Sequence, residues 1–110
     1  MSEGCEFLRV AKLDEIVEGE GKVIQHAGMD VALFRIGSEV YAVENTCPHQ
    51  GASLAEGWLE GETVVCPWHA WCFELKTGHM VMGDYASIET FDVQIRENEI
   101  WIATLPRAQH

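Results

Sequence analysis

Two short clusters of cysteine and histidine carry the residues best suited to chemistry in this chain. The first reads Cys-Pro-His over residues 47–49, and the second reads Cys-Pro-Trp-His over residues 66–69. Each cluster supplies one thiolate and one imidazole, and both groups are common metal ligands. Four ligands paired in this mixed way suit a metal centre that has two chemically different ends.

The spacing within each cluster allows its two ligands to act together. Cys47 and His49 lie two residues apart, so an extended backbone would place both side chains on the same side. Cys66 and His69 lie three residues apart, and a tight turn brings such residues together. The proline inside each cluster fixes its own φ angle and stiffens the backbone. We therefore expect two rigid loops, each presenting a cysteine beside a histidine.

Two kinds of metal centre would accept this ligand set. A 2Fe-2S cluster can be held by two cysteines on one iron and two histidines on the other, and the neutral imidazoles raise its reduction potential. A structural zinc ion would accept the same four ligands tetrahedrally. Common zinc patterns pair Cys with Cys and His with His, whereas each pair here is mixed. The iron-sulfur cluster is the favoured interpretation, and a zinc-stabilised binding module remains an alternative.

Short strands separated by turns must position these loops. Period-two alternation is clearest over residues 91–96. The apolar run at 100–102 is predicted to pair with this segment through a hairpin turn at 97–99. Gly37 and Ser38 predict a second hairpin turn. The sequence predicts strands over residues 6–10, 22–26, 31–36, 39–43, 63–65, 71–75, 90–96 and 100–104, with about one helical turn at 12–17 and at 52–55. This pattern predicts an all-β fold, either an antiparallel sandwich or a small barrel.

Both metal clusters fall where the strand pattern is interrupted, at residues 45–61 and 66–70. A loop as long as the first of these is uncommon unless it has a function. The chain shows no internal repeat and no linker, and its 110 residues match one hydrophobic core. We expect a single domain over residues 1–110, with its function carried on loops above a rigid β scaffold.

The charge balance restricts the possible partners. The chain has 18 acidic and 7 basic residues and a net charge of −11, which argues against binding to nucleic acid and favours a basic docking partner. No apolar run approaches the roughly 20 residues that span a bilayer, so we expect no membrane partner. The N-terminus lacks the basic and apolar segments of a secretory signal. These features predict a cytoplasmic protein.

The remaining cysteine, histidine and tryptophan residues receive structural interpretations. Cys5 and Cys72 are expected to be free thiols, with Cys72 beside the second loop. Trp68 and Trp71 flank His69, so at least one of them is expected to shield the metal. The residues expected in the core are Trp58 and Trp101, and those expected at the surface are His26, His79 and His110.

The two loops closely resemble those of Rieske-type ferredoxins. Residues 46–57, Thr-Cys-Pro-His-Gln-Gly-Ala-Ser-Leu-Ala-Glu-Gly, resemble the first cluster loop of that family. Residues 66–73, Cys-Pro-Trp-His-Ala-Trp-Cys-Phe, resemble the second, and a Thr-Gly turn follows at 77–78. The resemblance extends from about residue 8 to residue 105. It implies the Rieske fold, with antiparallel sheets and both loops at one tip. It also implies one 2Fe-2S cluster per chain, with the imidazoles binding through Nδ1. The implied ligands are Cys47, His49, Cys66 and His69.

A domain of this kind relays one electron and has no substrate chemistry of its own, so no residue is expected to be catalytic. The resemblance implies a carrier between a flavin-dependent NAD(P)H reductase and a Rieske-type ring-hydroxylating oxygenase. The small subunit of an NAD(P)H-dependent nitrite reductase is the alternative, because Trp71 follows His69 by two residues, as is frequent in that group. In that case the acceptor would be the large, sirohaem-containing nitrite reductase subunit.

The chain departs from the respiratory Rieske proteins at four positions. Ala52 and Trp68 stand where those proteins have a disulfide-forming cysteine pair. Trp71 and Phe73 stand where those proteins have a serine and a tyrosine whose hydroxyl groups bond to the cluster. The resemblance therefore implies a cluster without a neighbouring disulfide and with fewer hydrogen bonds to its sulfurs.

We expect the reduction potential to lie near the low end of the Rieske range, roughly −150 mV, because fewer hydrogen bonds leave the cluster harder to reduce. Protein-film voltammetry of the purified protein measures it directly. A clearly positive potential would contradict this expectation.

Overall fold

The computed structural model describes residues 6–47, 51–67, 71–81 and 87–107. Within these ranges the chain forms β-strands joined by short turns, and two 3-10 helices of one turn each. The strands are β1 (Phe7–Lys12), β2 (Gly21–His26), β3 (Met29–Ile36), β4 (Glu39–Glu44), β5 (Trp58–Glu60), β6 (Thr63–Val65), β7 (Cys72–Glu74), β8 (Thr90–Phe91), β9 (Val93–Arg96) and β10 (Glu99–Ala103), and the helices are η1 (Leu13–Glu15) and η2 (Leu54–Glu56). Neither described helix has the length or apolar character needed to cross a membrane.

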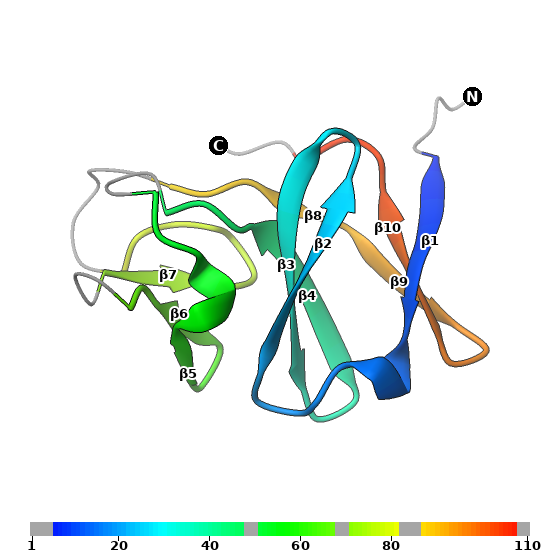
Figure 1. Cartoon of the computed structure of the whole chain (residues 1–110), viewed down its shortest axis with the longest axis horizontal. Helices are drawn as coiled ribbons and strands as arrows, with labels where there is room; N and C mark the ends of the chain where they lie inside the picture. Colours follow the sequence, from blue (N-terminus) through cyan, green and yellow to red (C-terminus); the bar gives the residue numbers. More distant parts are fainter. Residues whose placement is uncertain (1–5, 48–50, 68–70, 82–86, 108–110) are drawn as a thin grey trace.

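The strands form three antiparallel sheets. The end sheet has the order β1-β10-β9, the central sheet β2-β3-β4-β8, and the small sheet β5-β6-β7. Figure 1 shows the central sheet between the other two, with the small sheet on one side and β1, β9 and β10 on the other. The predicted all-β antiparallel fold is therefore confirmed.

Strand β3 occupies the middle of this arrangement, and both of its faces are buried. Val31 and Leu33 contact the core shared with the end sheet, whereas Ala32 and Phe34 contact the core shared with η2 and the small sheet. Successive side chains of a strand point to opposite faces, so one continuous apolar run serves both cores. The central strand thus places the two cores back to back.

Both predicted hairpin turns are confirmed by backbone conformation. Glu97 and Asn98, with φ of 52° and 69°, join β9 to β10, and Gly37, with φ of 63°, lies between β3 and β4. Left-handed residues match the twist of the strands that flank a two-residue turn. A third such turn, at Ala27 and Gly28, joins β2 to β3. The sequence pattern did not predict it because alanine rarely adopts a positive φ.

Two strand predictions are corrected. The single strand expected over 90–96 is two strands, because β8 pairs with β4 in the central sheet whereas β9 pairs with β10 in the end sheet. The exposed Asp92 lies at the point where the chain changes sheets, and its carbonyl accepts a bond of 3.0 Å from the Ala103 amide. Strand β5 was not predicted, because residues 58–60 fall within the segment 45–61 that was expected to be a loop.

Three predictions about side-chain burial are wrong. His26, expected at the surface, is only 3% exposed; its Nε2 lies 2.7 Å from the Ala103 carbonyl oxygen and its ring meets Phe91 edge-on. Trp58, expected in the core, is 48% exposed. Trp101, also expected in the core, lies outside it: the side chain is half-buried beneath the Arg96 guanidinium, on the face of β10 opposite the core residues Ile100 and Ile102. The expectation for His79 is confirmed, since it is exposed, and His110 lies outside the described residues.

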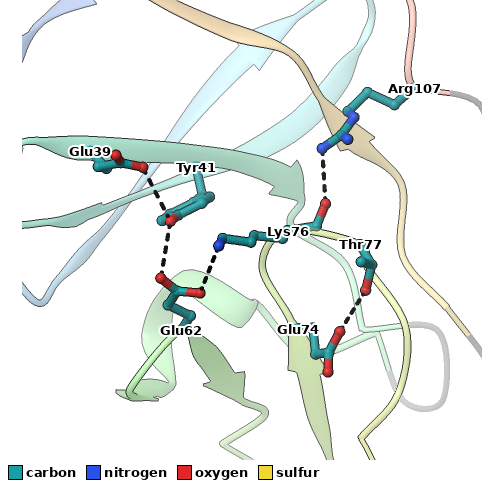
Figure 2. A network of polar contacts seen from close by, with 7 residues as sticks. All are labelled: Glu39, Tyr41, Glu62, Glu74, Lys76, Thr77 and Arg107. Atoms are coloured by element: carbon teal, nitrogen blue, oxygen red, sulfur yellow. Dashed lines mark hydrogen bonds and ion pairs between the residues drawn. The ribbon is translucent and has the colours of Figure 1, made fainter.

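A group of polar contacts, here called the polar clasp, joins the small sheet to the central sheet (Figure 2). The Tyr41 hydroxyl on β4 lies 3.5 Å from a Glu62 carboxylate oxygen, on the turn between β5 and β6. The other Glu62 oxygen lies 3.4 Å from the Lys76 ammonium. The Arg107 guanidinium donates a 2.9 Å bond to the Lys76 carbonyl oxygen. The clasp therefore ties the β5–β6 turn and the segment after β7 to the central sheet and to the C-terminal segment.

We expect the contribution of the Tyr41 hydroxyl to stability to disappear at alkaline pH. Partial burial and the Glu62 and Glu39 carboxylates raise the pKa of Tyr41 above its ordinary value of 10.0. A group whose pKa is raised by folding stabilises the fold fully below its unfolded pKa, and this stabilisation is lost as the pH rises through the folded pKa. Replacing Tyr41 with Phe should lower the midpoint unfolding temperature by about 2–4 °C at neutral pH.

That difference should shrink as the pH is raised from roughly 9 to 11, around the unfolded pKa of tyrosine. Thermal scans of the wild type and Tyr41→Phe, followed by circular dichroism at matched scan rates, measure it. A difference that stays constant over this pH range would show that the hydroxyl is not held in its neutral form by the clasp.

Candidate metal centre

The two predicted cluster loops close on themselves in the same way. The amide of Cys47 donates a 2.9 Å bond to the carbonyl oxygen of Ala52, and the amide of Cys66 donates a 2.8 Å bond to that of Trp71. In each loop the cysteine thus bonds to the residue five positions further along the chain. A second bond of 2.8 Å, from the Gly51 amide to the Cys47 carbonyl oxygen, closes the first loop further, and Gly51 has a φ of 75°. Both cysteines therefore stand at the fixed base of a closed loop.

Asn45 anchors the first loop to the central sheet. Its side chain is buried, and its Oδ1 accepts a 3.0 Å bond from the Ala55 amide while its Nδ2 donates a 3.0 Å bond to the Ser53 hydroxyl. Its backbone carbonyl accepts a bond from the Leu54 amide, and its own amide donates a bond to the carbonyl oxygen of Asp30 on β3. One side chain and its backbone thus hold both ends of the loop to the central sheet.

The second loop connects two strands of the small sheet. Cys66 directly follows β6, and β7 begins at Cys72, which is paired with Val65. The alternation of these strands turns Val64 and Phe73 into the core, so the adjacent Val65 and Cys72 share the opposite face. Cys72 is half-buried and lies next to the base of the second loop, as the sequence predicted.

The structure brings Cys47 and Cys66 into one buried apolar cluster. They are 1% and 0% exposed, and they belong to the same group of contacting residues as Leu54 and Phe73. Trp71, half-buried, packs against this group, and its ring centroid lies 6.5 Å from that of Phe73. The shielding role expected for Trp71 is consistent with this position, whereas Trp68 lies outside the described residues.

His49 and His69 also lie outside the described residues, so the structure locates two of the four predicted ligands. Among the residues that it describes, no three potential ligands come together. The two cysteines fit an iron-sulfur centre by their chemistry. Two thiolates in an apolar surrounding need a strong positive charge between them, because burial of an unpaired anion is costly. A centre held by these two cysteines would supply that charge.

The residues around the cysteines also support the expected low potential. Phe73 is fully buried and Trp71 is half-buried, and neither side chain carries a hydroxyl. The resemblance implies that respiratory Rieske proteins have a serine and a tyrosine at these two positions, whose hydroxyl groups donate hydrogen bonds to the cluster. The apolar cluster therefore offers no hydroxyl donor from either position.

Gly57 holds the base of the second loop against the end of helix η2, a role that the sequence did not predict. An ideal Cβ at this position would lie 1.9 Å from the Val65 carbonyl oxygen and 3.2 Å from Cδ of Pro67. Its φ of −79° is open to any residue, so close approach of the backbone, and not a left-handed conformation, requires glycine here. The anchoring role of Asn45 was not predicted either. Neither Gly57 nor Asn45 belongs to a periodic pattern that would have indicated its role.

We expect Gly57→Ala to destabilise the protein by about 1–3 kcal/mol, the usual cost of overpacking, and to release the metal centre at a lower temperature. Gly61→Ala is the matched control. Gly61 has a φ of 63° but nothing within 4 Å of an added Cβ, so that variant reports backbone strain alone. Thermal scans that follow both circular dichroism and visible absorption compare the two. A larger loss for Gly61→Ala than for Gly57→Ala would contradict the close contact at the second loop.

Comparisons with known proteins agree with the loops and the fold. The family model of the Rieske [2Fe-2S] domain matches residues 6–92. The 3-phenylpropionate/cinnamic acid dioxygenase ferredoxin subunit of Shigella flexneri serotype 5b is 39% identical over 97 residues, which cover 86% of this chain and 90% of that protein. The resemblance to the Rieske-type ferredoxins that was expected from the two loops is therefore confirmed.

Two solved structures share the fold over most of their length. A chain of the complex of reduced oxygenase and oxidised ferredoxin in carbazole 1,9a-dioxygenase superposes with a TM-score of 0.85 at 29% identity, over 96% of this chain and 100% of that chain. A protein described as the small subunit of an NADPH nitrite reductase superposes with a TM-score of 0.81 at 27% identity, over 88% and 97% of the two chains. The chain thus belongs to the Rieske [2Fe-2S] domain family, and its cofactor is one 2Fe-2S cluster.

Proposed function

We propose that this protein is a one-electron carrier that passes electrons from a flavin-dependent NAD(P)H reductase to a Rieske-type ring-hydroxylating oxygenase. The observation that carries the proposal is the match to a dioxygenase ferredoxin subunit along 90% of that subunit's length. The likeness to a ferredoxin solved together with its oxygenase supports the same acceptor class. We further propose that the whole chain, residues 1–110, acts as one domain in the cytoplasm, where NAD(P)H is available to such a reductase.

We propose Cys47, His49, Cys66 and His69 as the four ligands of the cluster. Burial of Cys47 and Cys66 in one apolar group supports their place on the inner iron, and the histidines complete the set on the outer iron. The cluster supplies one-electron redox chemistry when bound. The chain's own contribution is to fix the two thiolates by the closing bonds to Ala52 and Trp71 and to exclude water from them.

The small subunit of a nitrite reductase is a second candidate. The superposition on a protein described as such a subunit favours it, as does the tryptophan two residues after His69. The candidates differ in the acceptor. A ferredoxin would be a separate carrier, whereas the nitrite reductase subunit would remain bound to a sirohaem-containing large subunit. Membership of the Rieske family argues against the zinc-stabilised module.

Reconstitution tests the carrier function. With NADH, a flavin reductase and the oxygenase component of the same organism, the purified protein should restore turnover of the oxygenase. Omitting the protein should abolish turnover, because the two enzymes then lack an electron carrier. Stable purification with a sirohaem subunit, together with no oxygenase turnover, would favour the second candidate.

Cysteine variants test the proposed ligands. Cys47→Ser and Cys66→Ser should each lose the visible absorption and the electron paramagnetic resonance signal of the reduced cluster, because a thiolate ligand is removed. Cys72→Ser is the matched control, since Cys72 is only half-buried and lies outside the proposed ligand set. A normal cluster spectrum in Cys47→Ser or Cys66→Ser would refute the assignment.

A further inference from the structure

Trp58 is unusual because a large aromatic side chain stands 48% exposed on a short strand. Tryptophan side chains are highly buried on average, so an ordered, exposed one calls for an explanation. Its indole N–H donates a 3.2 Å bond to the Glu60 carboxylate, two residues along β5. The bond fixes the ring against the strand and leaves much of its apolar surface open to solvent.

The position of Trp58 is next to the second cluster loop. Trp58 pairs with Val65, which directly precedes Cys66, and the adjacent Gly57 packs against Pro67 inside the loop. The opposite end of β5 leads into the turn that carries Glu62. Strand β5 is an edge strand of the small sheet, and Figure 1 shows this sheet to one side of the central sheet. Trp58 is therefore an exposed ring at the end of the sheet from which the second loop leaves.

The surroundings of Trp58 are acidic. Strand alternation places Glu60 on the same face as Trp58, whereas Leu59 between them packs toward the core. Glu56 is exposed two residues before Trp58. Over residues 56–62 the sequence contains three glutamates and no lysine or arginine, and the Lys76 ammonium is engaged by Glu62. We call Glu56, Trp58 and Glu60 the Trp58 flank.

We propose that the Trp58 flank is a docking surface for the electron acceptor, on a face of that protein where basic side chains surround an apolar recess. Tryptophan is among the residues that dominate the energy of protein interfaces, above all when the contacts around it exclude water. The carboxylates of the flank, within a chain of net charge −11, are complementary to arginine and lysine. This inference rests on the proposed carrier function.

The charge of the flank favours the acceptor over the donor. The carrier gains one negative charge when it accepts an electron close to this surface. A basic partner therefore binds the reduced carrier more tightly than the oxidised carrier. An acceptor must bind the reduced form and release the oxidised form, whereas a donor needs the opposite preference. Basic contacts beside the second loop thus suit the acceptor.

Binding of the dithionite-reduced holoprotein to the purified oxygenase component of the same organism tests the proposal. Biolayer interferometry without oxygen should show that Trp58→Ala raises the Kd at least about tenfold, as expected for a residue central to an interface. Glu60→Gln should raise it severalfold, and this difference should fade at high salt because screening removes the charge contribution. Val23→Ala is the matched control: Val23 is 42% exposed on β2, an edge strand of the central sheet, and its removal should leave the Kd unchanged.

Three results would overturn the inference or what it rests on. An unchanged Kd in both Trp58→Ala and Glu60→Gln, each with a normal cluster spectrum, would overturn the docking surface while the carrier function stands. Weaker binding to the reductase alone would overturn the choice of the acceptor. No binding and no oxygenase turnover with the wild type would overturn the carrier function itself, and the docking proposal with it.

Discussion

The burial of two cysteine side chains in one apolar cluster is the constraint on which the rest of this structure depends. To ligate one iron together, as proposed, the two side chains must be held close to each other. The backbone meets this need by closing each loop at its cysteine, through bonds to Ala52 and Trp71. Asn45 then fixes the first loop to the central sheet. Gly57 lets the base of the second loop pack closely against the segment that follows helix η2.

Much of this arrangement could be predicted from the sequence, because it depends on local patterns. The alternation over 91–96, the turn residue Asn98 and the mixed Cys-His pairs all carry their information within a few residues. The errors arose where distant contacts decide the outcome. His26 is buried because β10 supplies a carbonyl acceptor, and the strand expected over 90–96 divides because its halves join different sheets. Neither fact is visible in a short window of sequence.

Apolar and polar contacts play different roles in attaching the small sheet to the central sheet. Phe34 and Phe73 belong to the buried group that joins the central sheet to the small sheet. The polar clasp acts at the edge of that contact, where Glu62 meets both Tyr41 and Lys76. The apolar group provides most of the free energy that holds the small sheet to the central sheet, since exposed ion pairs contribute little. The clasp provides a fixed orientation for the β5–β6 turn.

Strand β3 gives the molecule a property that neither core would have alone. Val31 and Leu33 belong to one core and Ala32 and Phe34 to the other, so neither core can open without exposing the strand that the other requires. Two regions that share a central strand melt together, as a single cooperative unit. The core that contains Cys47 and Cys66 therefore depends on the distant end sheet as well, because loosening the end sheet would expose the strand that both cores share.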